Sequence, residues 1–295
     1  MATKRVNFDF FTVHYGQSNT DTFDEKLKIE DKKNNKSEIE TFGYLLRIGD
    51  LKKVKRNNAF ATMDDNYFWV GAIERIDVKE EAYAGKKGVP GRSTYAAGED
   101  EGPLKDTVFL YDPKTGVLIL QRSRGGLTHN NMTNFISSMC HDENVILKVM
   151  IDKKVLTKLD KLPLVKSIEY SVSVPSPKSL SNNNRAVHGD INLLNHIQGN
   201  KMNIVIGADK DNQLSKKNAI TKVKDLLGSK EDVKRLVVKG YNNNDLEILD
   251  LINNRVESNK KVDAGPGKKV SYIHIMDTII IVFREKYKLI QDYTK

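Results

Sequence analysis

The feature that most constrains the fold is a pair of apolar segments that flank a short turn. TVFLYD at 107–112 and VLILQR at 117–122 surround the turn sequence PKTG. Turn residues between two runs rich in β-branched and aromatic residues predict a β-hairpin, here at 107–121. Thr128 follows as a good N-cap and predicts a helix that extends through Met139. We therefore expect a sheet with helices packed against it.

The second half of the sequence repeats one succession of elements, in which a strand is followed by a helix and another strand. Apolar periodicity predicts strands at 145–151, 167–174, 202–208 and 235–241, and helices at 153–162 and 215–227. The polar stretch at 179–189 is predicted to be a connection. The repeated β-α-β order indicates a ferredoxin-like or split α+β layer. The predicted fold class is therefore α+β, with an N-terminal sheet and helices followed by this layer.

Further elements and the chain length suggest two domains. Residues 6–15 and 67–78 are predicted to contain strands, whereas Thr41 is interpreted as the N-cap of a helix. Apolar residues at 275–290 predict an amphipathic last helix, which could serve as a dimer seam. A chain of 295 residues is long for one compact core. We expect an N-terminal α+β domain at 1–142 and a basic C-terminal α+β domain at 143–295.

The net charge of +9 is unevenly distributed along the chain. Residues 1–150 contain 22 basic and 22 acidic side chains, whereas residues 151–295 contain 26 basic and 17 acidic ones. Such asymmetry indicates a partner with dense negative charge, of which nucleic acid is the commonest and an anionic membrane surface the next. A lysine-rich surface that only faces solvent is the alternative.

The strongest candidate for a nucleic-acid interface is the basic region that begins with the helix predicted at 215–227. Apolar residues occupy one face of this helix, so its lysines lie on or near the other. Lysine suits sequence-independent contact with phosphate, because a flexible point charge reads no base. The predicted binding residues of this region are Lys216, Lys217, Lys222, Lys224, Lys230, Lys234, Arg235 and Lys239. A solvated helix face would give the same pattern.

A second basic candidate is the RSRGG segment, where Arg122 and Arg124 precede a helix N-terminus. Helix N-termini bind anions readily, so both arginines are included among the predicted nucleic-acid contacts. The alternative is that the glycines simply serve the exit of the hairpin. No GxxxxGK[ST] pattern occurs in the sequence, so the segment is not a P-loop.

The sequence predicts no catalytic residue, metal site or cofactor. Asp77 and Lys79 in IERIDVK resemble part of a restriction-type nuclease signature, with Asp64 or Asp65 as a further magnesium ligand. A metal-dependent nuclease is therefore kept as an alternative, although alternating charges on a half-exposed strand explain the same string. Cys140 stands alone and is interpreted as a structural residue.

Cysteine content and hydropathy point to a cytoplasmic protein. The single cysteine permits no intramolecular disulfide, which suits a reducing compartment. The N-terminal region lacks the features of a signal peptide, and the longest apolar run, at 279–283, is too short to cross a bilayer. We expect no membrane span.

The string TVFLYDPKTGVLILQRSRGGLTHNNMTNFISSM, followed by KLDKLPLVKSIEYSVSVP, resembles the RexA family of phage-exclusion proteins and the related Kiwa B defence subunit. It is also similar to a bacterial family whose members begin with a VNFDFF-like strand. The resemblance covers residues 105–240 and rests on the order of elements. It implies a DNA-binding, dimeric component of anti-phage defence that senses rather than cuts.

These observations give three hypotheses for function. The first is sequence-independent binding of nucleic acid, duplex DNA in preference to RNA, in phage defence or phage exclusion. The second is the metal-dependent nuclease centred on Asp77 and Lys79. The third is a protein-interaction subunit that works with an operon-encoded defence partner. A homodimer is expected under the first.

Overall fold

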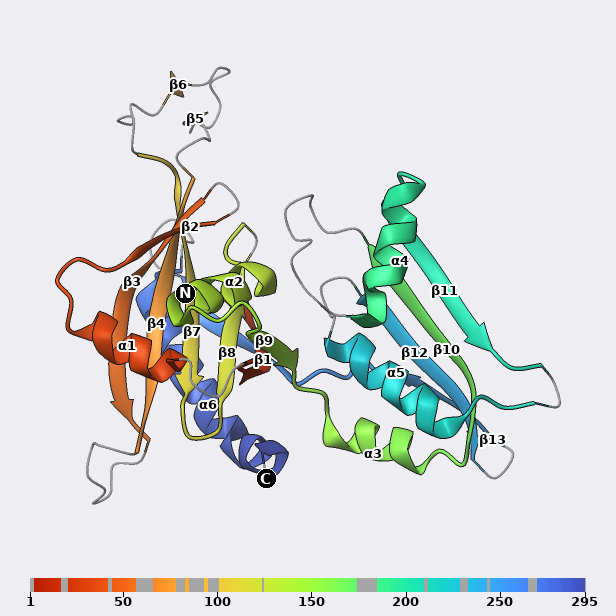
Figure 1. Cartoon of the computed structure of the whole chain (residues 1–295). Helices are drawn as coiled ribbons and strands as arrows, with labels where there is room; N and C mark the ends of the chain where they lie inside the picture. Colours follow the sequence, from red (N-terminus) through yellow and green to blue (C-terminus); the bar gives the residue numbers. More distant parts are fainter. Residues whose placement is uncertain are drawn as a thin grey trace. The chain divides into compact units, whose positions relative to one another are not determined.

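The chain has a mixed α+β fold, as the sequence predicts (Figure 1). The computed structural model describes residues 3–16, 21–41, 44–56, 66–77, 83–84, 93–94, 101–123, 125–173, 185–209, 212–228, 233–242, 245–264 and 270–294. Two compact units are present: unit 1 contains residues 1–8, 15–145 and 258–295, and unit 2 contains residues 9–14 and 146–257. The segment 258–295 thus packs with unit 1, although it lies after the predicted boundary between 142 and 143.

The large sheet of unit 1 has β4 (Tyr67–Ile76) near its centre. Its strand order is β14 (Glu257–Asp263), β1 (Thr3–His14), β8 (Val117–Arg122), β7 (Leu104–Asp112), β4, β3 (Tyr44–Lys55) and β2 (Glu38–Thr41). The two-residue strands β5 (Tyr83–Ala84) and β6 (Ser93–Thr94) pair with each other. Strands β7 and β8 form the predicted hairpin, in which Asp112 accepts hydrogen bonds from the Lys114 amide at 3.1 Å and the Thr115 hydroxyl at 2.8 Å.

The helix predicted from Thr41 is wrong. Residues 44–55 form β3, which pairs with both β2 and β4. The physical reason is the spacing of the buried side chains, because Leu46 and Ile48 are buried two positions apart, which is the period of a strand. The strand predicted within 67–78 is confirmed by β4.

Helices cover both faces of the sheet in unit 1 (Figure 1). Helix α1 (Phe23–Asp31) contacts Trp69 of β4 through Asp24, whereas α6 (Tyr272–Thr294) contacts the preceding residue, Phe68, through Phe283. Since neighbouring residues of a strand point to opposite faces, α1 and α6 lie on opposite sides. Helix α2 (His129–Cys140) begins at the predicted N-cap, Thr128, and packs against α1. The predicted last helix is confirmed by α6, and its apolar residues pack against unit 1's own sheet.

Unit 2 is built on a smaller antiparallel sheet. Its strand order is β11 (Lys201–Gly207), β10 (Leu164–Ser173), β12 (Val233–Asn242) and β13 (Asp245–Asp250). Strand β9 (Ile146–Val149) does not belong to this sheet; it pairs with residues 11–14 of β1 in the large sheet. The predicted helices at 153–162 and 215–227 are confirmed by α3 (Lys153–Lys161) and α5 (Lys216–Gly228). The prediction that 179–189 is only a connection is wrong for residues 185–189. These residues form the first part of helix α4 (Arg185–His196).

All three helices of unit 2 contribute to one core on one face of this sheet. Buried residues of β10 and β12, among them Ile168 and Leu236, pack with Leu159 of α3, Val187 of α4 and Val223 of α5. Figure 1 shows α4 and α5 over the same side of the sheet. Because side chains alternate along a strand, the odd-numbered residues at 167–173 of β10 and at 235–241 of β12 point to the opposite side, which we call the open face. Ser171 and Val237 on this face are buried.

Candidate nucleic-acid interface

The predicted basic helix is amphipathic in the expected sense. Ala219, Val223 and Leu226 of α5 are buried in the core of unit 2, whereas Lys217 and Lys224 are exposed. Lys217 and Lys224 are seven residues apart, so they lie on one side of the helix, about 10 Å apart along its axis. This outward side of α5 therefore presents two of the predicted lysines together.

Helix α3 adds a second row of lysines that sequence reasoning missed. Lys154, Lys158 and Lys161 are all exposed, and their spacing places them on one side of α3, away from the buried Leu159. The exposed Lys224 and Asp160 approach to 3.9 Å between Nζ and Oδ1, which places α3 beside α5. We call Lys154, Lys158, Lys161, Lys217 and Lys224 the lysine face. The signal was present in the sequence as KKVLTKLDK, but nothing local shows that α3 lies next to α5.

Two of the predicted residues, Lys216 and Lys222, lie beside the lysine face rather than on it. Both are half-buried on α5. The Lys222 ammonium lies 5.5 Å from the centre of the Tyr170 ring, and the Tyr170 hydroxyl donates to Asp190 at 2.9 Å. A lysine over an aromatic ring is held by the electrons of that ring, so Lys222 is directed back toward the protein.

Arg235 and Lys239 lie on the open face, on the other side of the sheet from α5. Glu169 of β10 forms ion pairs with both of them, at 3.3 Å for Arg235. The expectation that these two residues extend the helix surface is therefore wrong. The reason is strand alternation, since Leu236 and Val238 face the core and their neighbours must face away from it. Lys230 and the side chain of Lys234 lie outside the described residues.

The RSRGG segment belongs to unit 1, and its backbone bonds within the protein. The Gly125 carbonyl accepts a hydrogen bond from Arg75 at 3.1 Å, and the Leu127 amide donates to the Thr107 hydroxyl at 2.7 Å. Gly125 has a φ of 79°, which favours glycine. These contacts support a structural role at the hairpin exit. Arg122 is exposed at the end of β8, and Arg124 lies outside the described residues.

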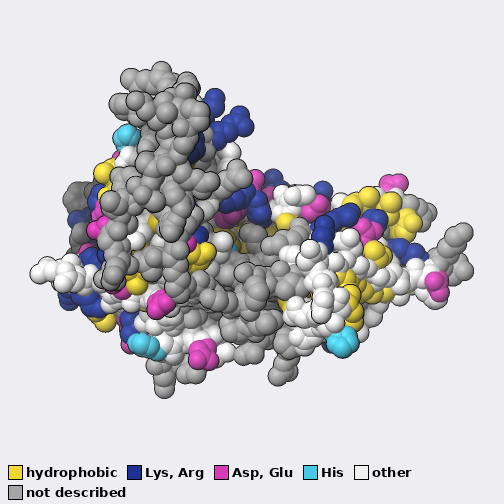
Figure 2. All heavy atoms as spheres, turned by 90° about the horizontal axis from the view of Figure 1, so that it is seen from above, with side chains coloured by type: hydrophobic (Ala, Val, Ile, Leu, Met, Phe, Trp, Pro, Cys, Tyr) yellow, Lys and Arg dark blue, Asp and Glu magenta, His cyan; other side chains and the backbone are white. Residues whose placement is uncertain are grey.

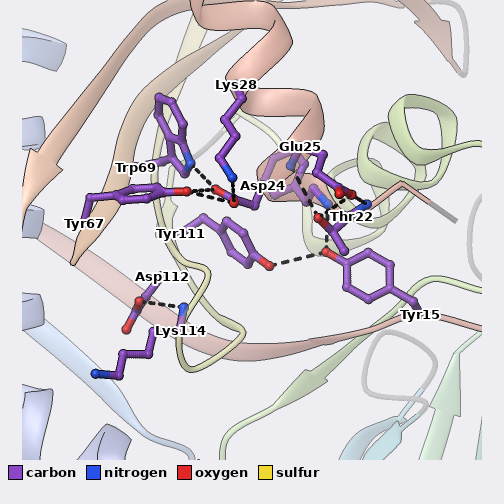
Figure 3. A network of polar contacts seen from close by, with 11 residues as sticks. Tyr15, Thr22, Asp24, Glu25, Lys28, Tyr67, Trp69, Tyr111, Asp112 and Lys114 are labelled. Carbon is purple, nitrogen blue, oxygen red and sulfur yellow. Dashed lines mark hydrogen bonds and ion pairs between the residues drawn. The ribbon is translucent and has the colours of Figure 1, made fainter. Parts of the chain in front are cut away.

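A connected group of polar side chains in unit 1 surrounds Asp24 (Figure 3). Its carboxylate accepts hydrogen bonds from the Trp69 indole at 2.7 Å and the Tyr67 hydroxyl at 2.8 Å, and it pairs with Lys28 at 2.8 Å. Burial on its own raises the pKa of Asp24, but the hydrogen bonds from Lys28, Trp69 and Tyr67 outweigh it and lower that pKa. An ionised carboxylate with three donors is suited to fixing α1 on the sheet, and it leaves little capacity for proton transfer.

Candidate catalytic residues gain no support from their surroundings. The Asp77 Oδ2 atom lies 3.8 Å from Arg75 Nη2 in an ion pair. Asp64, Asp65 and Lys79 lie outside the described residues, so the nuclease stays a prediction. In the part of the chain that the structure describes, no cluster of three or more His, Cys, Asp or Glu residues could hold a metal ion. Burial raises the pKa of the Cys140 thiol to about 12, which makes it a poor nucleophile. No described helix combines the length and apolar content that a membrane span requires.

Comparison with known proteins places the whole chain in one family. A search of curated proteins finds no match to it. A model of a family of unknown function, DUF6731, matches residues 1–291. The matched residues extend through both units. The chain belongs to the DUF6731 family of unknown function.

Proposed function

We propose that this protein binds nucleic acid without sequence preference, duplex DNA in preference to RNA, through the lysine face of unit 2. The observation that carries the proposal is the adjacency of α3 and α5, which turns two separate rows of exposed lysines into one basic surface. Neighbouring helix axes lie about 8–10 Å apart. The lysine face is therefore large enough to contact several phosphates on one side of a duplex.

The chemistry of this surface favours phosphate contact over base readout. All five residues of the lysine face are lysines, whose ammonium groups neutralise phosphates without the planar fork that arginine presents to guanine. Two arginines of the same unit are engaged elsewhere: Arg235 lies on the open face and pairs with Glu169, and Arg255 pairs with Asp9 and Glu257. We therefore propose that affinity comes from counterion release and falls steeply with salt.

Binding of labelled duplex DNA, single-stranded DNA and RNA over a salt series tests the proposal. The test variant is Lys217→Gln with Lys224→Gln, and the matched control is Arg235→Gln with Lys239→Gln. Both variants remove two positive charges from unit 2, and Lys224 and Arg235 have the same side-chain exposure, 60%. If each lysine contacts one phosphate, the plot of log K against log salt on duplex DNA becomes less steep in the test variant, by about 2 in the size of its negative slope.

The control separates a binding surface from a simple effect of net charge. We expect its slope to stay within about 0.5 of the wild-type value, because the open face does not contact the duplex. An equal loss in both variants would mean that only total charge matters. Absence of wild-type binding at low salt would overturn the proposal.

The biological setting that we propose, anti-phage defence, rests on the resemblance to phage-exclusion proteins. Its test is the plating efficiency of phages on cells that carry the wild-type gene in its operon. We expect protection, and we expect the Lys217→Gln, Lys224→Gln variant to lose it at equal protein level. If this variant still protects the cells, defence does not depend on the lysine face.

A further inference from the structure

The free edges of the two sheets differ in how they are protected against pairing with another strand. Three edge strands carry charged side chains along their length: β2 has Glu38 and Glu40, β13 has Asp245, Glu247 and Asp250, and β14 has Lys260, Lys261 and Asp263. Charges of this kind are a common device against edge-to-edge association. By contrast, the edge strand β11 of the small sheet has the sequence KMNIVIG and contains no charge after Lys201.

The backbone of β11 offers a row of hydrogen-bonding groups on its outer side. The Ala208 amide donates to the Lys166 carbonyl at 3.1 Å, so residue 208 points toward β10. Pointing direction alternates along an antiparallel strand, and therefore Asn203, Val205 and Gly207 direct their N–H and C=O groups away from β10. Within the described ranges no strand pairs with this side of β11.

The side chains of β11 are unusually apolar for their exposure. Val205 is 68% exposed on the open face, and Ile206 is 37% exposed on the other face. Hydrophobic side chains gather in patches beside lysines and arginines on the side of the molecule drawn in Figure 2, so apolar surface is not confined to the cores. Apolar groups that flank an unpaired strand edge on both faces favour a partner strand, because pairing would cover them as well as the backbone.

We propose that the partner strand is β11 of a second copy of this chain, paired antiparallel about a two-fold axis at Val205. In this register Val205 faces its own counterpart, Ile204 faces Ile206, and Lys201 faces Asp209. Lys201 and Asp209 are both exposed, and their positions differ from 205 by equal steps, so two symmetric ion pairs would form at the ends of the interface. This charge complementarity selects a second copy and sets the register.

The pairing joins the two small sheets into one continuous sheet of twice the number of strands. Residues 203, 205 and 207 all point outward, and in this register each of them meets another outward-pointing residue of the partner. Each such pair exchanges two N–H···O bonds. The interface is isologous, because one surface contacts itself, which is the commonest arrangement in homodimers.

The first test measures the mass in solution of nuclease-treated, full-length protein in high salt, so that nucleic acid cannot bridge two copies. The test variant is Val205→Lys, which places two ammonium groups opposite each other at the axis. The control is Ile248→Lys on β13, an apolar residue that is 57% exposed on the same open face of the same sheet. We expect wild type and Ile248→Lys to dimerise equally, and Val205→Lys to weaken the dimer at least about tenfold.

A monomeric wild-type protein at about 100 μM would overturn the proposal, because a functional homodimer requires at least this affinity. The same conclusion would follow if Val205→Lys dimerised as well as Ile248→Lys. Thermal unfolding of both variants shows whether the fold is kept. Since neither side chain belongs to a core, we expect both melting temperatures to remain close to that of the wild type.

A charge exchange then tests the register. Lys201→Asp and Asp209→Lys, made singly, each place like charges opposite each other in the dimer and should weaken it. The double variant restores opposite charges at both ends and should recover the dimer. If the double variant is no stronger than the single ones, Lys201 does not face Asp209 and the register centred on Val205 is wrong.

Discussion

The two sheets differ in how many of their faces are covered. In unit 1, β4 is buried on both sides, with the Phe68 ring centre 4.7 Å from that of Phe283 on one side and Trp69 directed to α1 on the other. In unit 2, the helices that the structure describes pack on one face, and Arg235 lies on the open face with 60% of its side chain exposed, although Val237 and Ser171 on that face are buried. Burial in unit 1 therefore contributes mainly to the stability of the fold, whereas unit 2 has exposed surfaces that can bind a partner.

The polar groups of the two units follow the same division. Unit 1 contains charged side chains that are buried and bonded, namely Asp24 and the ion pair of Arg56 and Asp112, beside other charged residues that are exposed. Those in unit 2 lie at the surface in weak pairs or in the lysine face. Changes to single charged residues should consequently affect folding in unit 1 and association in unit 2.

The largest loss of stability is expected for Asp112→Ala. Asp112 and Arg56 form an ion pair in which both side chains are almost completely buried. Removal of the carboxylate leaves a buried guanidinium without its charge partner, which costs about 3–5 kcal/mol in the free energy of unfolding. Urea unfolding measures this loss. Thr115→Ala, which removes only one hydrogen bond to the same carboxylate, is the control and should cost about 1 kcal/mol.

An Asp24→Asn variant should lose about 1.5–3 kcal/mol at pH 7, since bonds to a charged acceptor are stronger than neutral ones. The lowered pKa of Asp24 fixes the sign of the pH dependence. A carboxyl group whose pKa is lower in the folded than in the unfolded state stabilises the fold above about pH 4, and this contribution disappears as the pH falls further. The wild type should thus approach the variant in stability between about pH 4 and pH 2. Parallel curves over this range would contradict the assignment.

A smaller loss is expected for Gly71→Ala in β4. A methyl group there would lie 2.7 Å from the Asp50 carbonyl oxygen and 2.7 Å from the Phe109 ring, closer than packed atoms allow. Overpacking of this kind costs about 1–3 kcal/mol. Gly189 of α4 in unit 2 is the matched control, because nothing lies within 4 Å of its added methyl group. Gly189→Ala should stabilise the protein by about 0.5–1 kcal/mol, and thermal unfolding distinguishes the two outcomes.

Elements with strong local signals could be predicted from the sequence. The turn at Asp112 and its two apolar strands, the N-cap Thr128, and the amphipathic patterns of α5 and α6 all agree with the structure. Each of these signals lies within one short segment. The helix predicted from Thr41 is wrong because the spacing of the leucines alone does not distinguish a helix from a strand. The segment forms a strand because it pairs with β4.

The candidate interface could be predicted only in part, because it depends on which elements become neighbours. Lys217 and Lys224 share a helix face and were found, whereas the lysines of α3 were not, since only packing against α5 brings them into the same surface. Arg235 follows α5 closely in sequence, yet its strand alternation sends it to the open face. Helix α4 was missed because its start at Arg185 follows a polar, asparagine-rich stretch. Contacts between segments that are distant in the sequence, such as the one between α3 and α5, cannot be predicted from one short segment.

The smallest effect is expected for Arg235→Gln, and it is the sharpest test of the contrast between the units. Its ion pair with Glu169 spans 3.3 Å, but the arginine side chain is 60% exposed, so water and salt screen the attraction. Exposed pairs contribute about 0–1 kcal/mol, and Lys239 still pairs with Glu169 in the variant. We expect the urea midpoint to stay almost unchanged, whereas Asp112→Ala shifts it strongly. A loss above about 2 kcal/mol would mean that the open face is part of a structural core, and the division between a stabilising unit 1 and a contact-forming unit 2 would be wrong.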